Sequence, residues 1–190
     1  MELNLTTERL LLRPVVLSDV DLAIEMFTDP AVMKFVEEPA TPDQVVADMP
    51  TWIKRGGGRC IGIWCITDRI TGEKFGDTYL LPFSAEEDDN DWNLVVPDAM
   101  PEAEIEIGYF LKPSAWGKGY ATEACRRLLR FTFAETTLDQ VIAVVDENHA
   151  ASWNVLGKCG LTHRGTRRAF GDDSPYFSIT REQWVATFKR

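Results

Sequence analysis

The stretch "KPSAWGKGYATEACRRLLRF" (residues 112–131) joins an apolar run to a helix-like pattern, and Gly117 and Gly119 flank Lys118 at the junction. Glycine destabilises regular elements, so its place here needs a physical reason. Glycine lets backbone N–H groups approach a ligand closely, and at the start of a helix the favoured ligand is an anion. The stretch therefore predicts a phosphate-binding turn between a strand and a helix.

Two well-known glycine motifs do not fit this turn. A P-loop that ended at Gly117-Lys118 would need glycine where Lys112 stands, and Ser or Thr where Gly119 stands. A dinucleotide fingerprint would need a third glycine where Thr122 stands. The sequence therefore argues against an ATP or NAD site.

Length and charge narrow the class of protein. The 190 residues suit one domain, so we expect a single domain over 1–190. The formal net charge of −10 argues against a nucleic-acid partner, which needs a basic surface. No run approaches the roughly 20 apolar residues of a membrane span, and the N-terminus does not read as a signal peptide. We expect a soluble, cytoplasmic protein without a membrane partner.

The cysteines predict neither a metal site nor a disulfide framework. They form no CxxC pair, and the two histidines, His149 and His163, are not spaced as zinc ligands. We therefore expect no metal, and buried, reduced thiols at Cys60, Cys65, Cys125 and Cys159.

The N-terminal half reads as a strand, two helices and a strand hairpin. Thr41 and Gln44 form a capping box with Pro42 at the first helical position, while Pro50 should kink or split that helix. Ser18 is the expected cap of the preceding helix. The predicted elements are a strand at 9–16, helices at 18–29 and 41–55, and strands at 59–68 and 74–83.

In the second half, strands alternate with helices after an acidic, irregular stretch at 84–104. Hairpin strands followed by such alternation indicate a mixed sheet in an α/β sandwich. The predicted elements are a strand at 104–111, a helix from the glycine turn to about residue 133, a strand at 139–146, a helix at 152–158, a hairpin of 162–170 and 175–180 around "GDDS", and a closing helix at 181–189.

The segment "WGKGYATEA" (116–124) resembles the pyrophosphate loop of the GNAT acetyltransferase superfamily, Q/R-x-x-G-x-G/A. Trp116 departs from the usual Gln or Arg, as it does in the Rim-type ribosomal-protein acetyltransferase branch. The likeness extends to "TERLLLRPVVLSDVDLAIEMFTDPAVMKF" (7–35), "VVDENHAASWNVLGKCGL" (144–161) and "SPYFSITREQW" (174–184). Nearly the whole chain is covered in the right order, which is far more specific than a glycine pair.

The resemblance implies a GNAT-like fold with acetyl-CoA as co-substrate. Its sheet is mixed and mostly antiparallel, with splayed central parallel strands flanked by helices. The loop would bind the coenzyme pyrophosphate through its N–H groups at the positive end of a helix. A side chain at Gly119 should clash there, and Lys118 either adds charge or is an ordinary solvated lysine. The loop residues implied are Trp116, Gly117, Lys118, Gly119, Tyr120, Ala121 and Thr122.

By the same resemblance, the pantetheine arm lies between strands 107–111 and 141–146. Tyr109, Phe110 and Leu111 would line it, and the backbone N–H of Tyr109 or Phe110 would polarise the thioester carbonyl. Gly108 is consistent with a bulge or a close approach, or with simple packing. Asn148 would bond the pantetheine amides, although a turn-forming Asn is the plainer interpretation.

Glu106 is the candidate general base. An amine with a solution pKa of about 10.4 must lose a proton to attack a thioester, and some relatives carry a catalytic glutamate here. A solvated strand residue is the alternative for Glu106, Glu104 lies on the same strand face, and a water chain is another possible route.

Ser152 is the candidate hydrogen-bond donor to the coenzyme sulfur. Many members of the superfamily protonate that sulfur with a tyrosine, but Leu156 stands at its place in this chain. A serine hydroxyl is a poor acid, so we assign Ser152 a positioning role, with helix capping as the alternative.

The predicted function is direct transfer of an acetyl group from acetyl-CoA to a primary amine, on a protein N-terminus or a small molecule, in a ternary complex. Alternatives are a non-catalytic acyl-CoA-binding module and a protein-interaction module. The acidic run 86–91 either attracts a cationic acceptor or is a solvated loop, and a homodimer is plausible by resemblance. Aromatic residues that wall an acceptor pocket, or belong to the core, are Trp52, Trp64, Tyr79 and Trp92.

Overall fold

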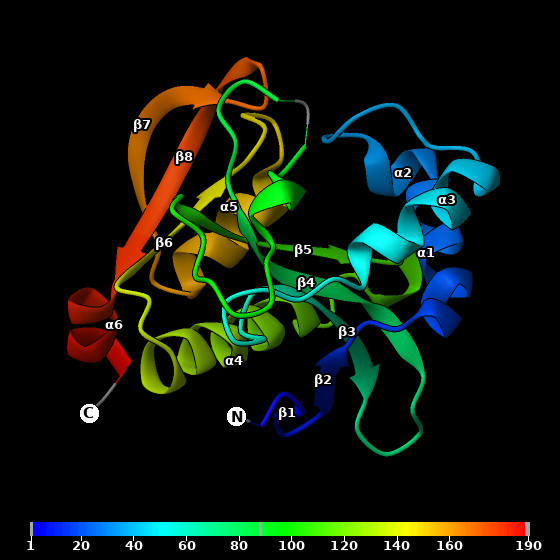
Figure 1. Ribbon diagram of the computed structural model, residues 1–190, viewed down its shortest axis with the longest axis horizontal. Helices are drawn as coiled ribbons and strands as arrows, with labels where there is room; N and C mark the ends of the chain where they lie inside the picture. The colour runs from blue at the N-terminus through cyan, green and yellow to red at the C-terminus, as the bar shows by residue number, and fades with distance from the viewer. Residues whose placement is uncertain (1, 88, 189–190) are drawn as a thin grey trace.

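The computed structural model describes residues 2–87 and 89–188. Its centre is an eight-stranded sheet in the order β1-β2-β3-β4-β5-β6-β8-β7 (Figure 1). Neighbouring strands run antiparallel except for the parallel pair β5 and β6. The strands are β1 (Leu5–Thr6), β2 (Leu10–Pro14), β3 (Gly62–Asp68), β4 (Lys74–Pro82), β5 (Ile105–Leu111), β6 (Gln140–Val144), β7 (Thr162–Ala169) and β8 (Asp172–Thr180). This mixed sheet confirms the predicted fold class.

Helices cover both faces of the sheet. They are α1 (Val20–Phe27), α2 (Pro30–Met33), α3 (Pro42–Trp52), α4 (Tyr120–Glu135), α5 (Ala150–Lys158) and α6 (Arg181–Phe188), with short 3-10 turns η1 (Leu17–Asp19), η2 (Trp92–Leu94) and η3 (Pro113–Ala115). Figure 1 shows α1, α2 and α3 grouped on one side of the molecule and α4 along its lower edge.

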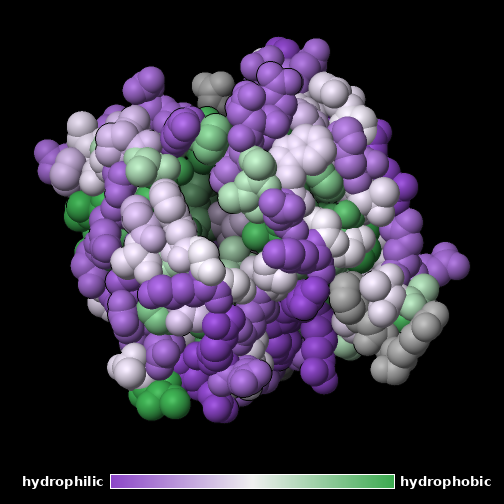
Figure 2. Space-filling model, turned by 180° about the vertical axis from the view of Figure 1, so that it is seen from behind, coloured by the Kyte–Doolittle hydropathy of each residue, from purple (hydrophilic) through white to green (hydrophobic). Residues whose placement is uncertain are grey.

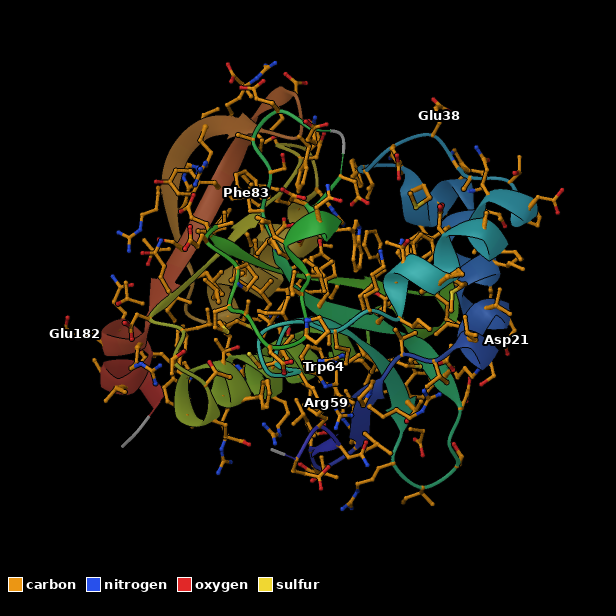
Figure 3. All side chains as sticks on the ribbon, in the orientation of Figure 1. Asp21, Glu38, Arg59, Trp64, Phe83 and Glu182 are labelled. Carbon is orange, nitrogen blue, oxygen red and sulfur yellow. The ribbon has the colours of Figure 1, made fainter. Side chains whose placement is uncertain are left out.

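Two neighbouring residues of β3 show how the faces divide. Trp64 is fully buried and packs edge-on against Phe131 of α4, with ring centroids 5.6 Å apart. Cys65, the next residue, lies in a cluster with Leu22 and Met26 of α1. Because successive side chains of a strand point to opposite faces, α4 and α1 cover opposite sides of the sheet. Figure 3 shows Trp64 in the interior and Asp21 of α1 at the rim.

Helix starts follow the predicted chemistry in α3 but not in α1. Thr41 and Gln44 form the capping box, and Pro50 lies in the last turn of α3 without splitting it. The helix ends at Trp52, before the predicted end at residue 55. Ser18 does not cap α1, which begins at Val20 after η1. Asp19 instead turns inward and binds Arg13 of β2, a contact that helix patterning does not reveal.

The last hairpin turns earlier than predicted. Phe170 and Gly171 have positive φ angles of 49° and 76°, as a tight two-residue hairpin turn requires. The residues "DDSP" (172–175) therefore belong to β8 rather than to the turn. The predicted capping of α6 by Thr180 and Gln183 is present, with reciprocal bonds of 3.0 and 3.2 Å. Lys189, the last residue of the predicted helix, lies outside the described residues.

The described residues can be compared with the predictions about membranes and metals. No helix among residues 2–87 and 89–188 combines the length and apolar character needed to cross a bilayer. Within the same residues, no three His, Cys, Asp or Glu side chains gather closely enough to hold a metal ion. All of the chain's cysteines are free and buried, as expected.

Candidate active site

The parallel strands β5 and β6 separate along their length. In the described part of the chain they share one register pair, Glu106 with Ile142. The other edge of β5 pairs continuously with β4, from Leu111 opposite Gly76 to Ile105 opposite Pro82. Beyond Glu106, the edge of β5 that faces β6 is therefore open. This is the splayed pair implied by the family resemblance.

The ladder with β4 determines which backbone groups face this gap. The N–H of Lys112 bonds to the carbonyl of Phe75 at 3.0 Å, on the β4 side. N–H groups alternate in direction along a strand, so the N–H of Phe110 also points to β4, where it meets the carboxyl group of Asp77. The N–H of Tyr109 points to the gap. The structure therefore favours Tyr109 over Phe110 as the backbone donor to a thioester.

The side chains of the predicted lining residues lie on both faces. Phe110 packs against Phe27 of α1, with centroids 5.2 Å apart, and Leu111 is buried in the main core. These two residues can thus contribute to the gap mainly through their backbone. Tyr109 points to the opposite face from Phe110, toward α5.

The start of α4 is built to accept an anion. Gly119 is its N-cap with φ of 80°, and Gly117 has φ of 71°, conformations that other residues rarely adopt. The helix's first backbone bond runs from Glu123 N–H to the carbonyl of Gly119 at 3.1 Å, and no side chain caps it. The N–H groups of the first turn therefore lack intrahelical acceptors and are available to a phosphate.

The backbone conformation at position 119 is a reason for glycine besides the predicted clash with the coenzyme, which stays a prediction. A Cβ there would lie 3.5 Å from the Nη2 atom of Arg9, which is an ordinary contact. The positive φ, rather than crowding by the protein itself, requires glycine. Lys118 is exposed and Ala121 and Thr122 are half-buried in the first turn, so the predicted loop residues are contiguous at this end of α4.

Arg9, the residue before β2, bonds to the glycine turn, a contact that was not predicted from the sequence. Its Nη1 donates to the carbonyl of Lys118 at 3.0 Å, and its Nε donates to Glu123 at 2.7 Å. Glu123 also accepts a 2.6 Å bond from Thr7. The guanidinium lies 4.7 Å from the ring centroid of Tyr120. Arg9 lies more than a hundred residues from the turn, so no local spacing could have revealed the contact.

Trp116, at the position where the motif departs from the family, has a structural role. Its indole N–H donates to the carbonyl of Leu111 at 2.7 Å, which fastens the turn to the end of β5. Tyr120 stacks on Phe75 of β4 with centroids 4.6 Å apart. These contacts hold both ends of the glycine turn against the sheet.

Glu106 is buried, with 3% of its surface exposed. Its Oε2 accepts a 3.0 Å bond from Asn90 Nδ2 and a 3.4 Å bond from the Tyr79 hydroxyl, and the N–H of Val144 on β6 also donates to the carboxyl group. Burial raises the pKa of Glu106 to about 7, although these donors oppose the rise. The interpretation of Glu106 as a solvated strand residue is therefore wrong.

Glu104 offers a contrast with Glu106. It lies before β5, its side chain is 44% exposed, and Arg167 pairs with it at 2.7 Å. Glu106 is the better candidate on geometry.

Gly108 and Tyr79 face each other across the β4–β5 ladder. A Cβ at Gly108 would lie 2.1 Å from the ring of Tyr79. The strand glycine therefore marks a close approach, one of the predicted possibilities. It lets the Tyr79 ring lie over the strand and bring its hydroxyl to Glu106.

Asn90 comes from the acidic run and was not singled out by sequence reasoning. It is buried and bonds to the carbonyl of Pro82 at 3.2 Å as well as to Glu106. Asp89 accepts a 2.8 Å bond from the indole of Trp92, and Glu86 pairs with Arg168 at 3.4 Å. Asp88 lies outside the described residues. Within the acidic run, Asn90 thus bonds directly to Glu106, the candidate base.

Ser152 lies in the first turn of α5 and faces Tyr109. Its Oγ is 2.9 Å from the Tyr109 hydroxyl. The N-cap of α5 is His149, and no side-chain bond caps it. The alternative of helix capping for Ser152 is therefore wrong, and its hydroxyl lies beside the gap.

The loop before α5 reaches across to the N-terminal helices. Asn148 is exposed, with its N–H on Asp146 at 2.8 Å. His149 stacks on Phe35, with ring centroids 4.5 Å apart, and burial lowers its pKa. Phe35 follows α2, so this stack joins the N-terminal helices to the loop between β6 and α5. Figure 2 shows a hollow with hydrophobic residues inside it, between the N-terminal helices and the tip of the β7–β8 hairpin.

The aromatic residues predicted to wall an acceptor pocket or to belong to the core lie in different surroundings. Trp64 belongs to the core, so its assignment to a pocket wall is wrong. Trp52 and Phe27 pack 4.9 Å apart, Phe27 contacts Phe110, and Phe110 lies 6.4 Å from Tyr79. These rings form a continuous aromatic line from α3 to Glu106. Trp92 packs against the main core.

A cavity of about 10 Å³, the size of one water molecule, lies behind this line between α1, α3 and the sheet. Asp77 and Asp19 both line it. Asp77 is buried with one carboxyl oxygen unpartnered in the described structure, and burial raises its pKa to about 7. Asp19 is also buried, yet bonds from Arg13, Val16 N–H and Lys74 outweigh desolvation and lower its pKa to about 2.

Comparison with known proteins agrees with this geometry. The acetyltransferase (GNAT) domain family matches residues 9–162. The FsC-acetyl coenzyme A-N(2)-transacetylase of Aspergillus fumigatus is 30% identical over 192 aligned positions, covering 96% of this chain and 78% of that protein.

Two solved structures show the same fold at lower identity. An acetyltransferase (GNAT family) from Bacillus anthracis has a TM-score of 0.73 at 22% identity, covering 94% of this chain and 98% of that one. The spermidine N-acetyltransferase from Vibrio cholerae, solved with CoA and spermine, has a TM-score of 0.71 at 16% identity, covering 94% and 98%. The predicted superfamily and enzyme class are confirmed by the family match and the curated relative. The chain belongs to the acetyltransferase (GNAT) family.

Proposed function

We propose that this protein transfers the acetyl group of acetyl-CoA to a primary amine by direct attack within a ternary complex. The observation that carries the proposal is Glu106, a buried carboxyl group with a pKa of about 7 beside the open edge of β5. A base poised near neutral pH and held by three donors suits proton abstraction from an amine.

The residues of the glycine turn suit coenzyme A. The free N–H groups at the start of α4 and the positive φ angles of Gly117 and Gly119 support a pyrophosphate site. The open edge of β5 supports a pantetheine site between β5 and β6, with Asn148 close to its β6 side. In this arrangement Arg9 and Trp116 position the turn without binding the coenzyme themselves.

The reaction assigns three groups of this chain to separate tasks. Glu106 takes the proton that the attacking amine loses. The N–H of Tyr109 stabilises the negative charge that develops on the thioester oxygen. When the carbon–sulfur bond breaks, its electron pair leaves on sulfur, and the Ser152 hydroxyl donates a hydrogen bond to that thiolate, which takes its proton from solvent.

The acceptor is a primary amine on a small molecule or on a protein N-terminus. The aromatic line from Trp52 to Tyr79 offers an apolar wall beside Glu106, which suits the stem of an amine rather than a second charge. The Aspergillus relative is named for N(2)-transacetylation, which supports transfer to a nitrogen atom. The Rim-type likeness supports a peptide N-terminus, and it also carries the expectation of a homodimer.

Calorimetric titration with acetyl-CoA, with ATP and NAD as controls, tests the coenzyme site. Micromolar, selective binding is expected. Release of free CoA should then be measured with a panel of small amines and of short peptides with free N-termini. Turnover with neither panel despite binding would favour a non-catalytic acyl-CoA-binding module. Absence of binding in a folded sample would overturn the proposal.

A further inference from the structure

We propose that Tyr109 is a positioning residue, whose hydroxyl holds the Ser152 hydroxyl so that its proton is directed at the coenzyme sulfur. The inference rests on the proposed function and extends it to a side chain. The sequence and the ladder assign Tyr109 only a backbone role, through its N–H. The phenol has a separate partner and therefore a separate task.

The placement of the two residues carries the argument. Tyr109 lies on β5 beyond Glu106, where the edge of β5 is open toward β6. Its side chain points to the face covered by α4 and α5, and its Oη lies 2.9 Å from Ser152 Oγ and 3.3 Å from the Ser152 carbonyl. The two hydroxyls thus bridge the strand and the helix that border the gap.

The environment of the phenol keeps Tyr109 protonated, so that it can donate to Ser152. Burial is the main cause that raises the pKa of Tyr109, and the neighbouring thiols Cys125 and Cys159 add to it. Both thiols are fully buried. The phenol therefore stays neutral near pH 7 and has two acceptors within reach, Ser152 Oγ at 2.9 Å and the Ser152 carbonyl at 3.3 Å. We assign its proton to Ser152 Oγ, the nearer of the two.

A serine hydroxyl has one proton and two lone pairs. When Ser152 Oγ accepts from Tyr109, its own proton is free to point toward a third group. The group that the proposed reaction brings to this gap is the thioester sulfur, which becomes a thiolate. A hydrogen bond to an ionised acceptor is stronger than one to a neutral acceptor, so the pair favours the leaving thiolate over the thioester.

The pair also offers a substitute for the family's tyrosine, whose place is taken by Leu156. Leu156 lies on α5 and is buried in the main core. A tyrosine on β5 that acts through a serine on α5 places a phenol near the sulfur from the opposite element. Neither residue needs to ionise. No proton is lost from the pair, because Ser152 donates a hydrogen bond rather than its proton.

The test is titration of the bound CoA thiol by its ultraviolet thiolate absorbance, in the wild type and in Tyr109→Phe, Ser152→Ala and the double variant. At a fixed pH near 7, each single variant should lower the thiolate fraction of bound CoA about tenfold. The double variant should match Ser152→Ala, because the two hydroxyls act in series. Tyr176→Phe, a tyrosine of β8, is the matched control and should leave the fraction unchanged.

Binding of desulfo-CoA, which lacks the thiol, separates this role from packing. Its affinity should be unchanged in all variants, and Ser152→Thr should restore the thiolate fraction that Ser152→Ala loses. An unchanged thiol titration in Tyr109→Phe, with CoA bound, would overturn the inference alone. A wild type that binds neither CoA nor desulfo-CoA would overturn the proposed function, and this inference with it.

Discussion

The pKa values of buried carboxyl groups in this protein shift in opposite directions because their partners differ. Asp19 accepts two bonds from Arg13, at 2.7 and 2.8 Å, and its pKa falls to about 2. Among residues 2–87 and 89–188, no cationic group lies at hydrogen-bond distance from Asp77 or Glu106, and burial raises the pKa of each to about 7. Strand and helix patterns treat all three as polar residues, so only the neighbours distinguish them.

Glu106→Gln should lower the rate of acetyl transfer about 100-fold or more while leaving acetyl-CoA affinity nearly unchanged. Glu106 must be ionised to act as a base, and its pKa is about 7. The wild-type rate should therefore rise with pH through about 7 and then level off. The rate of the variant should not show this rise. Initial rates from pH 5.5 to 9 check the prediction, and an unchanged profile in the variant would assign the base to another group.

Asp77→Asn should stabilise the protein above about pH 7, by an amount on the order of 1–3 kcal/mol. The folded-state pKa of Asp77 is about 7 against a reference value of 3.8, so the folded state holds the proton more tightly. The free energy of unfolding contributed by this group therefore falls as pH rises from about 4 to 7. Urea unfolding at pH 5 and pH 8 measures the difference, which the variant should reduce.

Asp19→Asn is the matched control with the opposite sign. The pKa of Asp19 is lowered to about 2 from 3.8, so its stabilisation is present above pH 4 and lost as pH falls toward 2. The variant should lose about 2 kcal/mol at pH 7. Equal effects of the two substitutions at pH 8 would contradict the assigned pKa values.

Among the elements, α4 and its glycine turn carry the proposed coenzyme site. The turn is held from three directions, by Arg9, by Trp116 and by the stack of Tyr120 on Phe75. A rigid turn keeps its N–H groups aligned before a phosphate arrives, so little ordering entropy is lost on binding. The positive φ of Gly119 is part of this alignment.

Gly119→Ala should destabilise the protein by about 1 kcal/mol and weaken acetyl-CoA binding, because the left-handed conformation is costly for residues with a Cβ. Gly119→Glu should abolish binding, since it adds a negative charge beside the phosphates. Gly157→Ala is the matched control: Gly157 lies inside α5 with open space around it, so alanine should stabilise by about 0.5–1 kcal/mol. Thermal unfolding and calorimetry measure both effects, and unchanged affinity in folded Gly119→Glu would reject the pyrophosphate site.

At the scale of the whole molecule, the gap between β5 and β6 divides the sheet into two halves. The halves are joined at Glu106 by one register pair and by the bond from Val144 N–H to the carboxyl group. The stack of Phe35 on His149 is a further contact between the two halves. A ligand that fills the gap should therefore bind the two halves together.

Acetyl-CoA at 100 times its Kd should raise the free energy of unfolding by about 2.7 kcal/mol, because it binds the folded state alone. Amide exchange should slow most at Tyr109 and in the first turn of α4, where N–H groups gain acceptors. Hydrogen–deuterium exchange with and without acetyl-CoA measures this pattern. Protection confined to β7 and β8 would place the coenzyme elsewhere.

Several features were predictable because they depend on near neighbours in the chain. The capping boxes at Thr41 and Thr180, the start of α4 and the mixed sheet follow from local residue types and their spacing. The prediction for Ser18 failed because Arg13 and Lys74 hold Asp19 inward. The position predicted for the hairpin turn was wrong because "GDDS" has the composition of a turn, whereas Phe170 and Gly171 adopt the positive φ angles.

By itself, the sequence determined the glycine turn, the order of the longer helices and strands, and the family, since each rests on residues adjacent in the chain. Only the tertiary structure decided that Glu106 is buried beside Asn90, that Arg9 holds the turn, and that Tyr109 meets Ser152. These contacts join residues from 16 to 109 positions apart. Burial and hydrogen bonding across such separations arise from packing, and packing has no local signature in the chain.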